Sequence, residues 1–518
     1  MGFIQRAKYL FTGKGLPQSR KYTPKFSTAT RENAFNSATL DRLTATFTGT
    51  SLSVNEMLRT DLVKMRHRSR SLVNNNDYGK KFISMVKANV VGSKGVRLQA
   101  KAKGSNGLPD TMDNEAIETA WKDWGKMQNC GVTGKLSLLD IQRVAVSTVA
   151  MEGECLIRIV YRSVYKYGMA LQLIEADRLD VELNETLKDG NRIVMSVELD
   201  EFDVPVAYYI LTSHPSESVY TFSGRKYLRI PASEMIHLFV PERISQARGI
   251  PWMHASIRRL NMIDGYEEAE LVAARAGASK MGFYYTETGE EYTGDDTDDA
   301  TGAPIQNAEP GTFEQLPMGT KFEAYDPQHP TGAYNYFLKG TLKGAAAGLG
   351  VSYTGYTGDL EAVNYSSIRA GLIEERENWR LVQGWFVEHC MALIYDKWLT
   401  GALTRGLIIN AAGVKLPLSR KEKFLSVTWQ ARGWAWVDPL KDQQANDAAV
   451  AAGHKTNSAV VAATGEDLEE VYEQLAWERE LAAKYGLDFS NKVSMNNDTE
   501  NDKEDNTEQP NKDDKTQN

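Results

Sequence analysis

The chain has 518 residues, of which 42% are hydrophobic and 25% are charged. This length suggests three or four folded units of about 100–200 residues each, and the composition is typical of a folded globular protein. The formal net charge of −8 argues against a protein that grips nucleic acid through a general basic excess, because such proteins neutralise many phosphates with Lys and Arg. We expect any contact with nucleic acid to be loose or confined to a local patch.

The cysteines and the lengths of the apolar runs indicate in which cellular compartment the protein is made. Cys130, Cys155 and Cys390 are widely spaced and odd in number, so they predict buried free thiols and neither a disulfide framework nor a cysteine-based zinc site. The sequence shows no secretory signal and no run of about 18 apolar residues. We therefore expect no transmembrane helix and a protein that is cytoplasmic when made.

The N-terminal segment, residues 1–50, is polar with weak periodicity, which predicts a partly disordered arm. Helical spacing begins at residue 53, where basic residues between Arg59 and Arg70 surround an apolar face. This basic cluster predicts either a phosphate-binding face or a charged helix that meets acidic surfaces of a neighbouring subunit. The stretch 74–76 offers an N-cap for a second helix, and Gly92 offers its end.

The next segments change from helical to strand periodicity. Helices are predicted near residues 115–127 and 138–151, and Ser137 stands where the second needs an N-cap. Alternating patterns then predict short antiparallel strands. They lie at residues 155–162, 169–174, 192–199, 204–211 and 234–240. Glu152 and Glu154, which flank Gly153 at the first strand, are expected to be structural and not catalytic.

A long helix is predicted at residues 251–280, because Pro251 suits a first helical turn. The following stretch, 281–320, contains nine Asp or Glu and no Lys or Arg. A second helix is predicted at 334–349, with Lys339 and Lys343 on one face.

Residues 353–359 are predicted to form a loop, because Gly355 and Gly358 interrupt any regular element. The loop is either a mobile contact in a pore or an ordinary solvent loop. Asn364 or Ser366 can cap a long helix that continues to about residue 398. Helices are also predicted near 439–454 and 467–484, and the tail from residue 491, with eight acidic residues and four Lys, should be disordered.

No motif predicts an enzyme. The sequence lacks a phosphate loop, an H-E-x-x-H helix and a G-x-S-x-G elbow. The seven histidines are scattered without metal-ligand spacing. We therefore expect no catalytic residues, no metal and no cofactor.

Four groups of motifs, each weak alone, occur in register and resemble the portal proteins of lambda-type tailed bacteriophages. They are residues 62–78 with 86–92, residues 152–154 with 173–179, residues 230–239 with 246–252, and residues 349–353 with 364–369 and 374–379. The first group matches the family's basic segment, which ends in Asn-Asn-x-Tyr and is followed by Asn-Val-Val-Gly.

The resemblance implies a mostly helical α+β portal fold with a wing, a two-helix stem, a small β-containing clip and a helical crown, assembled as a ring. The implied parts are an N-terminal arm (1–50), the wing (51–249), stem helix 1 (250–280), the clip (281–329), stem helix 2 (330–351), the tunnel loop (352–366), a long wing helix (367–400), a C-terminal wing and crown region (401–490) and an acidic tail (491–518).

The implied function is a channel at one capsid vertex for DNA packaging, head–tail connection and genome ejection, and the ring is expected to contain twelve subunits. The implied partners are the terminase large subunit, the major capsid and scaffold proteins, a head–tail adaptor and double-stranded DNA that passes non-specifically. Expected DNA-channel residues are Lys339, Lys343, Tyr353, Tyr356 and Asn364. Expected terminase- or adaptor-docking residues are Glu290, Glu291, Asp295, Asp296, Asp298 and Asp299. Alternatives are another phage head or head–tail connector component, or a packaging ATPase or nuclease.

Overall fold

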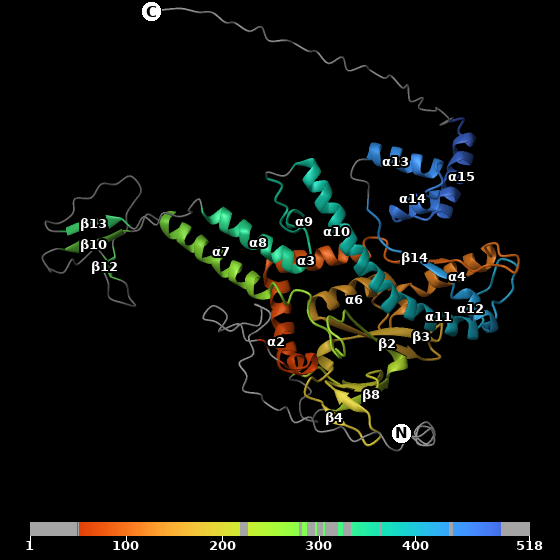
Figure 1. Cartoon of the computed structure of the whole chain (residues 1–518), viewed down its shortest axis with the longest axis horizontal. Coiled ribbons are helices and arrows are strands. Elements are labelled where there is room, and N and C mark those ends of the chain that lie inside the picture. The colour runs from red at the N-terminus through yellow and green to blue at the C-terminus, as the bar shows by residue number, and fades with distance from the viewer. Residues whose placement is uncertain are drawn as a thin grey trace, which may run out of the picture. The chain divides into compact units, whose positions relative to one another are not determined.

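The structure is a computed structural model. Its chain divides into two units, Met1–Ser53 and Val54–Asn518. It describes residues 49, 51–217, 226–278, 282–286, 296–297, 304–305, 320–324, 333–361, 364–434 and 439–487. The expected N-terminal arm and acidic tail lie almost wholly outside these residues. All elements below belong to the second unit (Figure 1).

Two helices open this unit. Helix α2 (Val54–Asn75) buries Leu58 and Leu62 on one stripe. Asn76 then caps α3 (Asp77–Val86), since its side chain accepts a hydrogen bond from the Gly79 amide at 2.9 Å. A π turn, η2 (Lys87–Val91), continues α3 and ends at Gly92, whose φ of 70° suits glycine. The predicted N-cap and end of this helix are confirmed.

The next helices are α4 (Thr111–Trp124), α5 (Met127–Cys130) and α6 (Leu138–Glu152). Ser137 and Asp140 form a reciprocal capping box at α6, which confirms the predicted cap. Helix α4 begins earlier than predicted because Asp110 caps it.

Two antiparallel sheets follow. The first has the order β3-β2-β9, and the second has the order β4-β5-β6-β7-β8. The strands are β2 (Glu154–Tyr161), β3 (Met169–Ile174), β4 (Glu185–Thr186), β5 (Arg192–Val194), β6 (Val197–Leu199), β7 (Pro205–Leu211), β8 (Tyr227–Pro231) and β9 (Met235–Phe239), with 3-10 turns at η3 (Ala176–Arg178) and η5 (Ala232–Glu234). The single strand predicted at 192–199 is wrong. Met195 and Ser196 have φ of 47° and 71°, which folds the segment into the β5–β6 hairpin.

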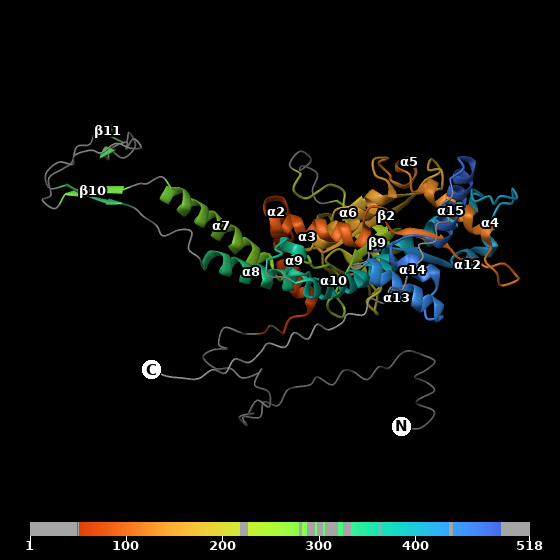
Figure 2. The same ribbon diagram turned by 90° about the horizontal axis from the view of Figure 1, so that it is seen from above.

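Helix α7 (Ile257–Ala278) and helix α8 (Ala333–Leu349) lie side by side (Figures 1 and 2). Helix α7 begins six residues later than predicted, because residues 251–256 form turns. Ile257, Leu260 and Ile263 are buried, whereas Leu271 is 65% exposed, so only the first half of α7 packs into the core. Between the helices, β10 (Gly282–Thr286) pairs with β13 (Thr320–Ala324), and β11 (Asp296–Thr297) pairs with β12 (Pro304–Ile305).

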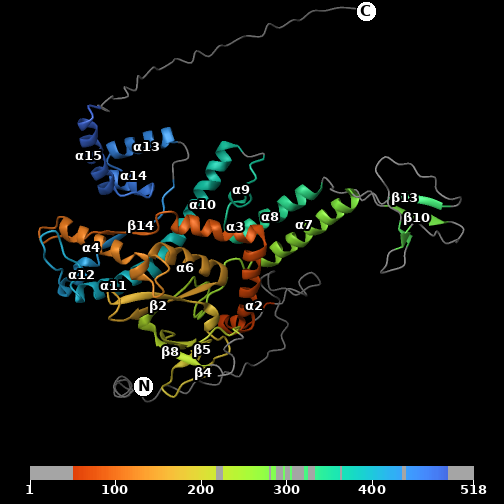
Figure 3. The ribbon, with the colours of Figure 1, turned by 180° about the vertical axis from the view of Figure 1, so that it is seen from behind.

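After α8 comes a short helix, α9 (Tyr353–Thr357), where a loop was predicted. The predicted long helix is observed as α10 (Tyr365–Phe386), the π turn η6 (Val387–Met391) and α11 (Ala392–Thr404). The chain continues through η7 (Leu418–Arg420), α12 (Lys421–Phe424) and β14 (Val427–Gln430), which pairs with β1 (Arg97–Ala100). Helices α13 (Pro439–Ala451), α14 (Asn457–Ala463) and α15 (Leu468–Lys484) come last (Figure 3).

The core has two apolar clusters. The larger spans α3, α4, α6, β2, α7, α8, α10 and α11, and the smaller lies between α2 and the five-stranded sheet. Trp121 packs edge-on against Tyr395 and Trp398 with ring centroids 5.6 and 5.0 Å apart. The three cysteines are free and buried, as predicted. Burial raises the pKa of Cys130 to about 11, so these thiols serve as packing groups.

Candidate functional site

The surface formed by α8 and the segment after α9 gathers several of the predicted DNA-channel residues. The Lys339 ammonium lies 3.1 Å from the Asp359 carboxylate and 2.5 Å from that of Glu361. The Tyr353 hydroxyl donates to Asp359 at 2.8 Å, and the Lys343 ammonium lies 5.5 Å from the centre of the Tyr353 ring. We call these five residues the α8–α9 patch.

The α8–α9 patch has no net charge, because it contains two lysines and two carboxylates, and both carboxylates contact Lys339. Hydrogen bonds from Lys339 to Glu361 and Asp359 raise the pKa of Lys339 above its ordinary value, so the ammonium is fully protonated. A phosphate that approaches Lys339 has to compete with these carboxylates. The patch is therefore suited to brief contacts with a polyanion and poorly suited to tight binding.

Helix α9 forms despite its glycines because each occupies a position that favours glycine. The Ser352 hydroxyl caps the helix by accepting from the Gly355 amide at 3.2 Å. A Cβ at Gly355 would lie only 3.1 Å from the Glu375 carboxylate. Gly358 ends the helix with a φ of 76°. The predicted loop is thus an ordered turn of helix, fixed to α10 through the hydrogen bond from Ser352 to Glu375.

Tyr356 lies inside the core and not on a channel-facing surface of this chain. Its side chain is 1% exposed, and its ring centre is 5.9 Å from that of Tyr78 on α3. The Tyr78 hydroxyl in turn donates to Glu267 on α7 at 3.3 Å, and burial, with the Glu267 carboxylate, raises the pKa of Tyr78 to about 12. The expected DNA contact is corrected here: Tyr356 anchors α9 to α3.

The remaining predicted residues do not join the patch. Asn364 is exposed and caps α10, where its side chain accepts from the Ser367 amide at 2.8 Å. Asp296 lies in β11. The other docking residues, Glu290, Glu291, Asp295, Asp298 and Asp299, lie outside the described residues.

A buried ionic cluster joins α2 to the first sheet, and the sequence patterns did not reveal it. Glu154 is fully buried at the start of β2, and its carboxylate lies 2.6 Å from Arg66, 2.5 Å from Arg248 and 2.9 Å from His237. Burial alone would raise the pKa of Glu154, but Arg248, His237 and Arg66 hold it well below its usual range. The carboxylate is therefore ionised, and α2, β2, β9 and the segment before Gly249 meet on it.

Arg66 and Arg70 also bind Asp177, Arg66 at 2.7 Å, and Arg70 lies 2.8 Å from Glu152. Both readings of the basic cluster are therefore wrong for these two arginines, since they face carboxylates of their own chain. Three of the four resembling motif groups contribute to this cluster. The occurrence of these motif groups in distant segments was the only sequence signal from which contact between these residues could have been predicted.

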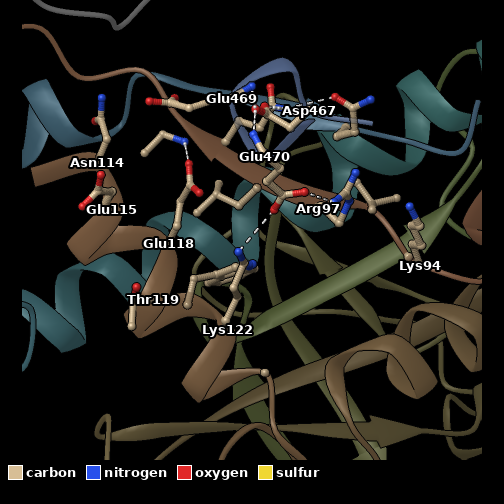
Figure 4. Close-up of a pocket in the computed structure, with 18 of the residues that line it drawn as sticks. Lys94, Arg97, Asn114, Glu115, Glu118, Thr119, Lys122, Asp467, Glu469 and Glu470 are labelled. Carbon is tan, nitrogen blue, oxygen red and sulfur yellow. Dashed lines mark hydrogen bonds and ion pairs between the residues drawn. The ribbon is translucent and has the colours of Figure 1, made fainter. Parts of the chain in front are cut away.

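A pocket of about 610 Å³ lies where the start of α15 approaches β1 and α4 (Figure 4). Glu470 lies 2.8 Å from Arg97 and 3.4 Å from Lys122, and Glu466 lies 2.9 Å from Lys94. Burial raises the pKa of Glu118, which accepts from the Ala100 amide at 2.8 Å. Most of the charged side chains that line the pocket are already paired, so we interpret the pocket as a polar seam between α15 and the rest of the unit.

Neither a metal centre nor a membrane span emerges from the part of the chain that the structure describes. Within these ranges, no three His, Cys, Asp or Glu side chains gather in a way that could hold a metal ion. None of the described helices is both long and apolar enough to cross a bilayer.

Comparisons with known proteins settle the family. The model of the family described as phage portal protein, lambda family, matches residues 40–383. This chain belongs to that family. The chain is 33% identical over 485 residues to a probable portal protein of Halomonas phage phiHAP-1, with 92% of each chain covered. It is 22% identical over 463 residues to portal protein B of Escherichia phage lambda, with 82% of this chain and 85% of the relative covered.

Among solved structures, the chain is similar to one from the virion of a native gene transfer agent particle, at 13% identity and a TM-score of 0.46, with 81% of this chain and 96% of the other covered. The family assignment depends on the sequence matches alone. Lambda-family membership and the observed mixture of helices with small antiparallel sheets agree with the predicted α+β portal fold.

Proposed function

We propose that this chain is the subunit of a ring, twelve subunits in number, that forms the DNA channel at one capsid vertex of a tailed phage. The observation that carries the proposal is the lambda-family match over residues 40–383, supported by a relative that aligns over 92% of both chains. Double-stranded DNA enters through the ring during packaging, and the same ring connects the head to the tail and releases the genome.

We assign the parts of the subunit by combining the family resemblance with the order of the elements. Helices α7 and α8 are the stem, the β10–β13 and β11–β12 pairs between them belong to the clip, and residues 352–366, with α9, are the tunnel loop. The long helix from α10 to α11 and residues 51–249 are the wing, and α13–α15 belong to the crown.

The partners follow from these parts. The clip presents a stretch, 281–320, with nine acidic residues and no basic one, which suits docking to the terminase large subunit and later to a head–tail adaptor. The wing contacts the major capsid and scaffold proteins. The protein is assembled in the host cytoplasm, resides in the virion, and acts as a structural channel without enzymatic activity.

The α8–α9 patch is proposed to touch DNA transiently as it slides. Lys339 is paired with two carboxylates and Lys343 lies over the Tyr353 ring, so contacts with phosphates form and break without a large barrier. The double variant Lys339→Glu/Lys343→Glu should slow packaging or lower genome retention, measured as DNA protected from nuclease in a packaging reaction. Normal packaging by this variant would remove the contact role.

Negative-stain electron microscopy of the full-length protein tests the function itself. The expected result is a closed ring with a central channel, whose rotational symmetry gives the subunit number. The ring should also restore DNA packaging when mixed with terminase and empty capsids. A filament, or a ring that terminase does not use, would contradict the proposal. An isolated-protein ATPase assay separates the enzymatic alternative, for which we expect no turnover.

A further inference from the structure

Three arginine side chains surround one indole ring beside α10. The guanidinium carbons of Arg376, Arg380 and Arg432 lie 6.0, 5.8 and 5.7 Å from the centre of the Trp434 ring. These distances are those of cation–π contacts. We call these four residues the Trp434 arginine cluster. It is a local concentration of positive charge in a chain whose formal net charge is −8.

Neighbouring amides hold the cluster in place. The Asn89 side-chain oxygen accepts from Arg432 at 2.6 Å and from the Trp434 indole N–H at 3.2 Å. The buried Gln383 amide on α10 donates to the backbone carbonyls of Asn89 at 2.8 Å and of Arg432 at 3.0 Å. The arrangement is therefore fixed before any ligand arrives, which lowers the entropic cost of binding.

Within the part of the chain that the structure describes, two of the arginines form no ion pair with a carboxylate. Arg376 makes no hydrogen bond or ion pair with any residue that the structure describes, and its buried Nε has no acceptor. Arg432 donates to neutral oxygens, those of Ala88 and Asn89. Burial and the charge of Arg380 lower the pKa of Arg376, and burial and Arg376 lower the pKa of Arg432. The mutual repulsion would be relieved by an anion.

The nearby carboxylates are already engaged. Glu377 accepts from Arg380 on the solvent side, Glu375 accepts from the Trp379 indole at 3.0 Å, and Asp442 pairs with Arg369 at 3.0 Å. Within the residues that the structure describes, no carboxylate pairs with Arg376 or Arg432, and the pair of Arg380 with Glu377 is exposed and therefore weak, so the cluster keeps positive charge for a ligand.

We propose that the Trp434 arginine cluster is a binding site for the backbone phosphates of double-stranded DNA. The choice of DNA rests on the proposed function, which brings a duplex to this protein. Guanidinium groups match phosphate oxygens with paired N–H donors. Successive phosphates of a strand can occupy several arginines, whereas one acidic side chain of a neighbouring subunit would leave at least one of them unmatched.

The test is the binding of a labelled duplex of about 30 base pairs to the full-length protein, followed by fluorescence anisotropy at several salt concentrations. The variant Arg376→Gln/Arg380→Gln should bind about 5- to 20-fold more weakly at low salt and reduce the slope of log K against log salt by about 1.8, the value for two phosphate contacts. The matched control, Arg420→Gln/Arg479→Gln, removes the same charge from two exposed arginines elsewhere and should change both much less.

Other outcomes are equally informative. The single variant Arg380→Gln alters a side chain that is 52% exposed, so it keeps the fold and should show about half of the change in slope. Titration calorimetry with inorganic phosphate separates a free-phosphate site, in which phosphate binds and the variant's DNA affinity is unchanged, from a DNA site. Equal DNA binding by variant and control would overturn the proposal. So would loss of ring assembly with normal DNA binding, which would assign the cluster to a subunit interface. Failure of the unaltered protein to form rings would instead contradict the proposed function.

Discussion

Glu154 carries a full negative charge at a position from which water is excluded, and this is possible only because Arg66 and Arg248 are equally buried beside it. Removing water from ions costs several kcal/mol for each, and close pairing with additional hydrogen bonds offsets that cost. Arg248 adds such bonds to the carbonyls of Leu179 and Met195 at 3.1 and 2.9 Å. The cluster therefore makes the position of α2 depend on the first residue of β2.

The variant Glu154→Gln should lower the free energy of unfolding by about 3–5 kcal/mol, because it leaves the buried Arg248 guanidinium without a counter-charge and removes one of the two carboxylates that pair with buried Arg66. Urea unfolding followed by circular dichroism measures the loss. The matched control is Glu182→Gln, since Glu182 is 61% exposed and lies 3.8 Å from Arg59, so its change should stay within about 0.5 kcal/mol. Equal effects of the two variants would mean that the buried cluster does not stabilise the fold.

Asp177 gives the cluster a pH dependence. Burial alone would raise its pKa, but Arg66 and Arg70 lower it from 3.8 to about 2. The unfolded chain therefore takes up this proton first as pH falls, and the stabilisation, fully present above about pH 4, is lost as pH falls towards 2. Urea midpoints measured across this range should fall less steeply in Asp177→Asn than in the unaltered protein. The control Glu201→Gln changes an exposed carboxylate and should leave the slope of urea midpoint against pH unchanged. If Asp177→Asn also leaves this slope unchanged, Asp177 is not the source of the pH dependence.

At the scale of elements, features that depend on neighbouring residues were predicted well, whereas features that depend on contacts between distant segments were not. The caps at Asn76 and Ser137 depend on residues within one turn, so the sequence shows them directly. The β5–β6 hairpin was missed because Met195 and Ser196 are unusual at positive φ and only the surrounding sheet selects them.

The candidate site divides in the same way. Lys339 and Lys343 were predicted from their spacing on one helix, but the pairing of Lys339 with two carboxylates after α9 was not. The Trp434 arginine cluster joins residues from α10 and from the segment after β14, more than fifty positions apart in the chain. Hydrophobic periodicity in the sequence does not predict contact between such distant residues, because the contact depends on how the helices pack.

Tyr356 shows how α9 is attached to the core. Its hydroxyl is buried and has no hydrogen-bond partner among the described residues, so Tyr356→Phe should keep the unfolding free energy unchanged or raise it by up to about 1 kcal/mol. Tyr356→Ala removes the ring that packs on Tyr78 and should lower it by about 3–5 kcal/mol. Thermal unfolding of both variants, with hydrogen exchange of residues 353–361, checks the pair. A loss of stability in the Phe variant would mean that the hydroxyl has a partner in the folded protein.

At the scale of the whole molecule, two kinds of attachment coexist in residues 54–487. Helices α6 and α11 are held by apolar contacts in the larger core cluster, whereas α13, α14 and α15 contribute no buried residue. Polar contacts across the seam of Figure 4, such as Arg97 with Glu470, join the last helices to the body. Apolar contacts are insensitive to moderate salt, but exposed ion pairs are screened within about 8 Å at physiological ionic strength.

The last three helices should therefore loosen as salt rises while the core stays unchanged. Raising NaCl from about 0.05 to about 0.5 M, which shortens the screening length severalfold, should speed amide hydrogen exchange in α15 and leave α6 unaffected. Arg97→Gln also removes the hydrogen bond to the Gly465 carbonyl at 2.8 Å. In this variant, amide exchange in α15 should already be fast at low salt. Arg192→Gln breaks an exposed pair with Asp203 in the second sheet and should leave α15 as it was. If hydrogen exchange in α15 responds neither to salt nor to Arg97→Gln, contacts other than these charges hold the C-terminal helices to the rest of the unit.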